Sequence, residues 1–167
     1  MSLDIYIKIA GVDGESSDST HQGWIEIQNI STGISLPFSN TSYSSTGGGT
    51  NTGRADFDYI TFTKFMDNAS VKLQEYCATG KTCATVEIHF CQAGDGQEKH
   101  SYMTYKLKDA VISRYSVSAS QHDTTRPMES ISLAYGNIEL GYKKLEDAGS
   151  AGAEVKFEYS LKENKKV

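Results

Sequence analysis

The fold is decided by the stretch that opens the chain, which reads DIYIKIAGVDGESSDSTHQGWIEI over residues 4–27. Isoleucine occupies every second position at both ends of it, at 5, 7 and 9 and again at 25 and 27. A period of two indicates a strand that buries only one of its faces. The glycines and aspartates between the two ends can supply a tight turn. The stretch therefore predicts two half-buried strands joined by a polar loop.

Length and charge limit the class of protein. The chain has 167 residues and a formal net charge of −5, so we expect residues 1–167 to form a single domain with its own core. The acidic balance offers no positive field for nucleic acid. Charged residues interrupt every apolar run, which predicts no membrane insertion. The start of the chain also lacks the basic and apolar regions of a cleavable signal peptide.

The rest of the chain is dominated by strand signals. Apolar and polar residues alternate over 84–90, and a longer strand over 102–118 is expected to have a bulge or corner near Asp109-Ala110. The last strand alternates clearly, and we expect its apolar side chains to point inward: Val155, Phe157, Tyr159 and Leu161. Many strands separated by turn residues predict a mainly β fold, either a barrel or a sandwich.

One helix is predicted, at about residues 71–79. Ser70 is placed to cap its start and Gly80 to end it. Leu73, Tyr76 and Cys77 share one stripe. A helix of this length is not stable alone, so the stripe must dock on the sheets.

A segment rich in Gly, Ser and Thr covers residues 39–54 and has the composition of an exposed loop. Its end imitates the spacing of a phosphate-binding P-loop. However, Arg54 stands where that motif needs Lys, and Ala55 stands where it needs a hydroxyl. Strand character follows instead of a helix, so no helix N-terminus faces the phosphate. We therefore predict no phosphate site here.

Residue types that carry chemistry are scattered. The four histidines, at 21, 89, 100 and 122, fall on different predicted elements, and none adjoins a nucleophile motif. Cys77, Cys83 and Cys91 are spaced too loosely for the pairs typical of zinc sites, and we expect them to be small packed side chains. The sequence therefore predicts no catalytic, cofactor-binding or metal-binding residue. A hydrolase that uses scattered His, Asp and Ser residues is one alternative, which substitutions at His21 and His122 would test.

Two aromatic residues, Tyr6 and Trp24, lie on the faces of the first strands that do not carry the isoleucines. Exposed aromatic rings can stack on sugars, and they are also enriched at subunit interfaces. A monomeric ligand- or carbohydrate-binding β-barrel is therefore a second alternative.

Several motifs together resemble the hemolysin-coregulated protein family. They are Gly14-Glu15-Ser16 with Asp18 and His21 before the Ile25-Glu26-Ile27 strand, then FTKFMDNAS over residues 62–70, Tyr76-Cys77 and Gly80-Lys81, and the strand over 155–166. The likeness spans nearly the whole chain and is weaker from Gly141 onward.

The resemblance implies a β-barrel of two antiparallel sheets with one flanking helix, and a structural protein rather than an enzyme. Family members form hexameric rings that stack into the inner tube of the type VI secretion system. The expected partners are further copies of the chain, the sheath, spike and baseplate components, and effector proteins held in the lumen. The protein would begin in the bacterial cytoplasm and be secreted without a cleavable signal. The chain stops directly after its last predicted strand, so we expect no appended toxin domain.

The resemblance also suggests roles for particular residues. Candidates for contacts between stacked rings come from the Gly-rich loop: Ser39, Tyr43, Gly47, Gly48, Gly49 and Arg54. Small polar side chains suit a lumen that holds varied cargo, and the candidates for that face are Gln28, Ser31 and Ser35.

Overall fold

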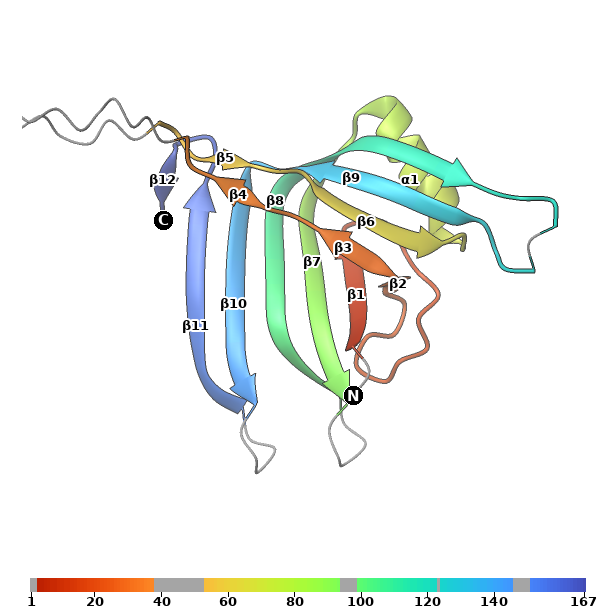
Figure 1. The fold of residues 1–167 in the computed structure, drawn as a ribbon, viewed down its shortest axis with the longest axis horizontal. Coiled ribbons are helices and arrows are strands. Elements are labelled where there is room, and N and C mark those ends of the chain that lie inside the picture. The colour runs from red at the N-terminus through yellow and green to blue at the C-terminus, as the bar shows by residue number, and fades with distance from the viewer. Residues whose placement is uncertain (1–2, 38–52, 94–98, 123, 146–150) are drawn as a thin grey trace, which may run out of the picture.

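The computed structural model describes residues 3–37, 53–93, 99–122, 124–145 and 151–167 (Figure 1). Its elements, in chain order, are β1 (Leu3–Ile9), β2 (Ile25–Ile27), β3 (Asn29–Ser31), β4 (Ile34–Ser35), β5 (Asp56–Phe57), β6 (Ile60–Phe65), α1 (Ala69–Thr79), β7 (Thr82–Ala93), β8 (Lys99–Ser118), β9 (Met128–Ala134), β10 (Asn137–Leu145), β11 (Ala151–Ser160) and β12 (Lys165–Lys166). The prediction of a mainly β fold with a flanking helix is confirmed.

Strand β8 divides the fold into two layers. Its first half pairs with β7 and β10, and its second half pairs with β9. Between the halves lies Asp109, whose φ of 53° is a left-handed conformation. The predicted corner near Asp109 is therefore confirmed, and it lets one strand belong to both layers. We call β1, β2, β7, the first half of β8 and β10–β12 the main layer, and β3, β6, β9 and the second half of β8 the second layer.

All of these pairings are antiparallel, but the hydrogen-bonded ladder does not close into a barrel. Among the described residues, the strands run in the order β12-β11-β10-β8-β7-β1-β2, with β9, β6 and β3 branching from β8. The path ends at β2 and the branch ends at β3, and only Gln28 separates these two strands in the chain. The Gln28 N–H donates to the Thr63 carbonyl oxygen at 2.7 Å. The two layers are thus joined at this side by the covalent link through Gln28 and one hydrogen bond, and not by a continuous strand ladder. β4 and β5 form a separate two-stranded sheet.

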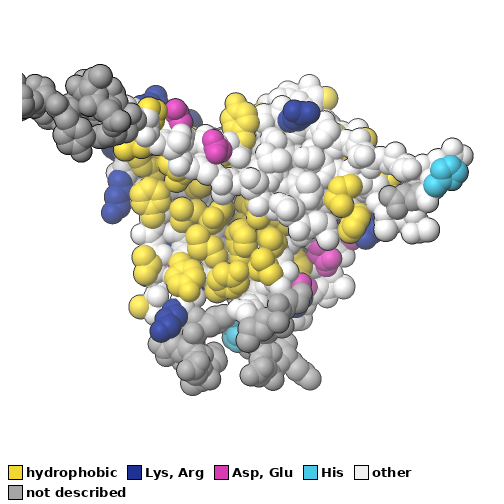
Figure 2. All heavy atoms as spheres, viewed as in Figure 1, with side chains coloured by type: hydrophobic (Ala, Val, Ile, Leu, Met, Phe, Trp, Pro, Cys, Tyr) yellow, Lys and Arg dark blue, Asp and Glu magenta, His cyan; other side chains and the backbone are white. Residues whose placement is uncertain are grey.

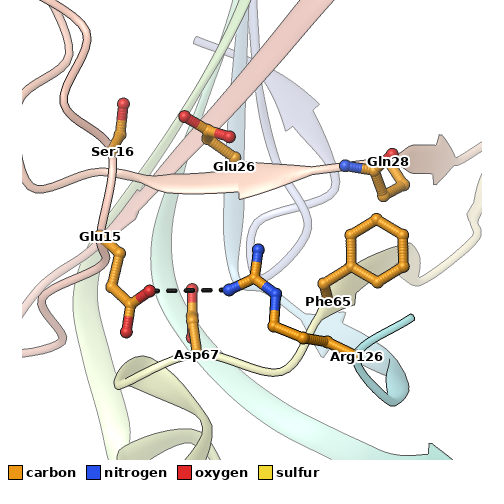
Figure 3. A pocket seen from close by; sticks show the side chains of 7 residues that line it. All are labelled: Glu15, Ser16, Glu26, Gln28, Phe65, Asp67 and Arg126. Carbon is orange, nitrogen blue, oxygen red and sulfur yellow. Dashed lines mark ion pairs between the residues drawn. The ribbon is translucent and has the colours of Figure 1, made fainter. Parts of the chain in front are cut away.

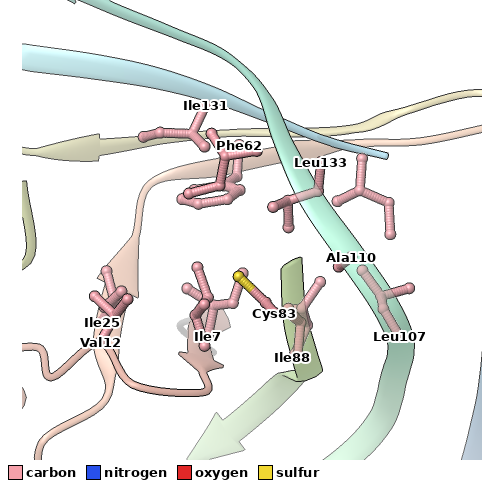
Figure 4. Close-up of a cluster of buried hydrophobic side chains, with 14 of the residues drawn as sticks. Ile7, Val12, Ile25, Phe62, Cys83, Ile88, Leu107, Ala110, Ile131 and Leu133 are labelled. Carbon is pink, nitrogen blue, oxygen red and sulfur yellow. The ribbon is translucent and has the colours of Figure 1, made fainter. Parts of the chain in front are cut away.

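The core lies between the two layers (Figure 4). The main layer contributes Ile7, Ile25 and Ile88, and the second layer contributes Phe62 and Ile131, each fully buried. The alternation at the start of the chain is confirmed, because β1 and β2 pair with Ile5 opposite Ile27 and Ile7 opposite Ile25. Isoleucines opposite one another share a face, so the opening stretch supplies one wall of the core.

Helix α1 begins two residues earlier than predicted, and the predicted Ser70 cap is wrong. Ser70 lies inside the helix, where its Oγ accepts from the Asp67 N–H at 3.0 Å. The first free N–H groups are met instead by Asp67 Oδ1, which accepts from Ala69 at 2.9 Å, and by Glu15 Oε1, which accepts from Asn68 at 2.9 Å. A local carboxylate, Asp67, and one from a distant part of the chain, Glu15, therefore share the capping role predicted for Ser70. No helix among the described residues is long and apolar enough to cross a membrane.

The end of the helix is as predicted. Gly80 adopts φ 63° and ψ 28°, and its N–H bonds back to the last turn. Leu73 and Tyr76 are buried, so the predicted stripe docks the helix on the fold.

Candidate assembly surfaces

The second layer presents a face of small, uncharged polar side chains to the outside. Residues opposite one another in neighbouring strands share a face, and the pairings of β3, β6, β9 and β8 align them in rows. One row is Ser31, Thr61, Ser132 and Arg114, and the next is Asn29, Thr63, Ser130 and Ser116. Only Arg114, at the edge, carries a charge. We call this surface the hydroxyl face.

The hydroxyl groups of this face partly bond to one another. Thr61 Oγ1 and Ser132 Oγ lie 2.9 Å apart, and the Ser113 hydroxyl donates to the Ser132 carbonyl oxygen at 3.1 Å. In Figure 2 the surface over β3 and the middle of β6 and β9 is mostly white, and a small yellow group lies at its right-hand end, where Phe65 pairs with Met128. Such a surface can offer hydrogen bonds to many partners and attracts no single charge.

A second surface lies where β10 and β11 extend beyond the second layer. On one face, Ile138 lies opposite Leu107 and Tyr159, and the next positions continue this apolar pattern. The remaining members are Leu140 with Tyr105 and Phe157, and Tyr142 with Met103 and Val155. We call this surface the apolar wing, and Figure 2 shows it as a continuous yellow area over β8, β10 and β11.

Burial decreases along the apolar wing with distance from the core. The side chain of Ile138 is 3% exposed, Tyr142 is 48% exposed and Val155 is 70% exposed. The prediction that Val155 points inward is therefore wrong, because its side chain is largely exposed in the single chain. Its face has the predicted alternation, but no part of the second layer reaches far enough to cover it.

The opposite face of the wing is charged. Lys108 pairs with Glu158 at 3.1 Å, and Lys156 pairs with Glu139 at 3.6 Å. A sheet with one charged and one apolar face places the charged face in water and buries the other. An exposed apolar face that adjoins the core is typical of a surface that contacts another molecule. The apolar wing is therefore a candidate subunit interface.

The β4–β5 sheet forms the base of the segment over 38–52. Ile34 pairs with Phe57, and the Gly53 N–H donates to the Pro37 carbonyl oxygen at 3.2 Å. Arg54, one of the predicted stacking residues, donates from its guanidinium to the Leu161 carbonyl oxygen. The other five predicted stacking residues lie outside the described residues.

The three predicted lumen residues fall in different places. Ser31 is exposed and lies on the hydroxyl face. Gln28 is exposed beside that face and lines a pocket of about 110 Å³ with Phe65 and Arg126, where Arg126 pairs with Glu15 at 3.7 Å (Figure 3). Ser35 is exposed on β4, in the separate two-stranded sheet.

One group of side chains resembles a catalytic triad. Asp18 Oδ1 lies 3.3 Å from His21 Nδ1, and His21 Nε2 lies 3.8 Å from Cys91 Sγ. Cys91 is fully buried, however, and burial raises the pKa of its thiol to about 11. His21 Nε2 is also engaged by His89 Nδ1 at 2.9 Å. The thiol is therefore protonated and out of reach of a substrate.

The alternatives suggested by the sequence find little support in this geometry. His122 is exposed in the connection between β8 and β9, whereas His21 is buried against His89. The rings of Tyr6 and Trp24 both pack on His21, with centroids 4.5 and 4.8 Å away. Neither ring is thus arranged as an open platform for a sugar.

Sequence reasoning missed the hydroxyl face almost entirely. Its members come from four strands, and each strand shows only two or three small polar residues at alternate positions. Reading Thr61 and Thr63 together with Ser130 and Ser132 would have revealed it, because both pairs keep a period of two. The register that aligns them is a tertiary feature that no single strand contains.

Comparison with known proteins agrees with this architecture. Residues 6–142 match the family model described as type VI secretion system effector, Hcp. Protein hcp1 of Pseudomonas aeruginosa is 28% identical over 165 residues, which cover 98% of both chains. A solved type six secretion system protein is 32% identical, with a TM-score of 0.89 over 99% of this chain and 100% of that one.

The fold is shared more widely. Hcp1 from Salmonella typhimurium is 24% identical and superposes with a TM-score of 0.78, covering 100% of each chain. At that identity the likeness shows the fold alone. The family model, by contrast, matches well over half of the sequence. The chain belongs to the Hcp family of type VI secretion proteins.

Proposed function

We propose that the protein is a structural subunit of the inner tube of the type VI secretion system, in which residues 1–167 form one tube-subunit domain. Six copies would close into a ring, and rings would stack into a tube whose lumen carries effector proteins. The protein would act without catalysis and would meet the sheath, spike and baseplate during assembly. It would leave the bacterial cytoplasm with the tube, without a cleavable signal. The observation that supports this proposal most strongly is the apolar wing, an apolar face of β8, β10 and β11 that remains exposed in a single chain.

The two surfaces suit the two tasks of a tube subunit. A ring closed by repeated contacts needs two different, complementary patches on each subunit, and the apolar wing is suited to be one of them. The hydroxyl face suits the lumen, because small uncharged side chains bind varied cargo weakly. The Gly-rich segment over residues 39–54 is the candidate for contacts with the next ring.

The ring itself is tested by negative-stain microscopy of the purified chain. Particles with six-fold symmetry and a central channel would support the proposal. A homogeneous monomer at high micromolar concentration would contradict it and favour the ligand-binding alternative.

The role of the hydroxyl face needs its own test. Ser31→Arg places a large cation on this face and is expected to reduce effector co-purification at least tenfold while rings persist. Ser17→Arg, an equal change at an exposed position in the β1–β2 connection, serves as the control. Equal effector recovery from both variants would show that the hydroxyl face does not contact the effectors.

A further inference from the structure

Two histidines from distant parts of the chain are stacked into one cluster on the outer side of the main layer. His21 belongs to the connection over 10–24, and its side chain is almost fully buried. Its ring stacks on Tyr6 with an interplanar angle of 6°, and Trp24 meets it edge-on. Trp24 also packs on His89 of β7 at 4.6 Å. The cluster thus fastens the connection to β1 and β7.

The hydrogen bonds in this cluster have one consistent direction. The Thr20 hydroxyl donates to Asp18 Oδ1 at 2.7 Å. Its oxygen can then only accept from His21 Nδ1–H, at 2.8 Å. That tautomer leaves a lone pair on His21 Nε2, which accepts from His89 Nδ1–H at 2.9 Å. A single hydrogen therefore lies between the two rings.

Acid changes this link in two steps. A first proton can bind His89 Nε2, which lies 3.8 Å from Glu87 Oε2, without breaking the bond between the rings. A second proton on His21 Nε2 would set two N–H groups against each other at 2.9 Å and bring two positive charges together. Neither ring can then accept, so the rings must separate.

The nearest carboxylates lie at the outer nitrogens of the pair, Asp18 Oδ1 at 3.3 Å from His21 Nδ1 and Glu87 Oε2 at 3.8 Å from His89 Nε2, so they do not remove the clash between the two facing N–H groups. The titratable and charged groups near the His21–His89 pair come from every element packed against it. They are Asp4, Tyr6 and Lys8 of β1, Asp18 of the connection, Glu87 and Cys91 of β7, Lys99 and Lys106 of β8, and Lys143 of β10. Lys99 already binds Asp4 at 2.9 Å and Asp18 at 2.8 Å. Its hydrogen bond holds the pKa of Asp18 well below the ordinary range, so this carboxylate stays ionised. Burial, with His21 and two lysines nearby, lowers the pKa of His89 to about 4.

The same connection holds other parts of the fold. Its two limbs bond to each other, with the Gly14 N–H donating to the Gly23 carbonyl oxygen at 2.8 Å. Glu15 bonds the start of α1 through Asn68 and pairs with Arg126. Release of the connection would therefore also loosen the helix start.

We propose that the His21–His89 pair is an acid-sensitive latch that holds the connection over 10–24 on the main layer. At neutral pH the latch is closed by one hydrogen bond between uncharged rings. When both rings take up a proton, the latch opens and the connection leaves β7. The residues of the latch lie on the opposite side of the main layer from the apolar wing.

Hydrogen–deuterium exchange of the whole chain tests the latch. Protection in peptides covering 13–24 is measured at pH 7 and at a pH clearly below the His89 pKa of about 4, corrected for the intrinsic exchange rate. The wild type should lose protection there at least tenfold at the lower pH, while β6 and β9 keep theirs. His89→Gln should lose much less, because its amide N–H can still donate to His21 and does not titrate. His122→Gln, at an exposed histidine elsewhere, should behave as the wild type.

Three results would overturn the proposal. One is unchanged protection of 13–24 in the wild type at a pH clearly below 4. Another is an equal loss in His89→Gln, which would place the sensitivity elsewhere. If that variant does not fold, the ring nitrogen shifts of the wild type decide the matter. At neutral pH both rings should carry hydrogen on Nδ1, and a hydrogen on His21 Nε2 would contradict the latch.

Discussion

At the scale of single residues, the side chain that most needs polar partners is a fully buried lysine, Lys64. Lys64 Nζ contacts Glu129 Oε2 at 2.8 Å and Asp67 Oδ1 at 2.7 Å, and Tyr115 donates to the other Glu129 oxygen at 2.6 Å. Lys64 and Glu129 are both 0% exposed. A buried charge is tolerated only when it is paired and hydrogen-bonded. This network joins β6, β8 and β9 to the start of α1.

Replacing Lys64 with Met should be severely destabilising, because it leaves the Glu129 carboxylate buried without a counter-charge. We expect a loss of about 3–5 kcal/mol in the free energy of unfolding. Lys72→Met breaks the exposed pair with Glu75 and should cost less than about 0.5 kcal/mol. Urea denaturation at one fixed subunit concentration compares them, and similar midpoints for the two variants would refute this role of the network.

The lowered pKa of His89 predicts that the stability of the fold depends on pH. Its pKa in the folded chain is lowered to about 4, whereas an unfolded histidine titrates near 6.5. The unfolded state therefore binds the proton more readily between these values. Stability should be full above about pH 6.5 and fall as the pH drops to about 4, by at most about 3 kcal/mol. Thermal unfolding of the wild type and His89→Gln measures this, and parallel pH profiles would count against it.

At the scale of elements, the alternating strands were predictable and the helix start was not. The period of two in β1 and β2 is a local property, so it survives in the fold. The helix start depends on Glu15, which lies more than fifty positions before Asn68 and reaches it only through tertiary structure. Ser70 was a plausible cap from local sequence, but its hydroxyl serves the Asp67 backbone instead.

The end of α1 should tolerate only residues that accept a left-handed backbone. Nothing lies within 4 Å of a side-chain carbon added to Gly80, and its φ is 63°. Gly80→Ala should thus cost about 1–2 kcal/mol from backbone strain alone. Gly80→Asn should cost less, since Asn visits this conformation more readily. Chemical denaturation compares the free energies of unfolding of the two variants. An Ala variant as stable as the wild type would show that the helix can end without a left-handed residue.

The proposed stacking role of the Gly-rich segment can be tested by replacing residues 38–52 and leaving the described residues on either side unchanged. A variant that replaces these residues with a short Gly-Ser linker keeps Pro37, Gly53 and Arg54, which hold the base. We expect folded rings that stack into tubes at least tenfold less readily, because contacts to the next ring are lost. Sedimentation of tubes measures this. Unfolding of the variant, or unchanged stacking, would show that the loop has another role.

At the scale of the whole molecule, the sequence predicted the strand-rich fold and its family better than its surfaces. Val155 illustrates the limit. Its alternation with Lys156 correctly places it on the apolar face of β11, yet the chain itself does not cover that face. Periodicity reports which residues avoid water and not which molecule covers them. The hydroxyl face was missed for a related reason, because it exists only through the register of several strands.

The central claim is that the apolar wing joins subunits into a ring, and the mass of the assembly in solution tests it most directly. Val155→Lys and Val71→Lys make the same change at two highly exposed valines, 70% and 74%, one on the wing and one on α1. Light scattering coupled to size-exclusion chromatography should give the wild type and Val71→Lys six times the mass of one chain. Val155→Lys should give folded monomers, because a lysine in the interface would be buried without a partner. Six-fold mass for Val155→Lys, or a monomeric wild type, would contradict the account.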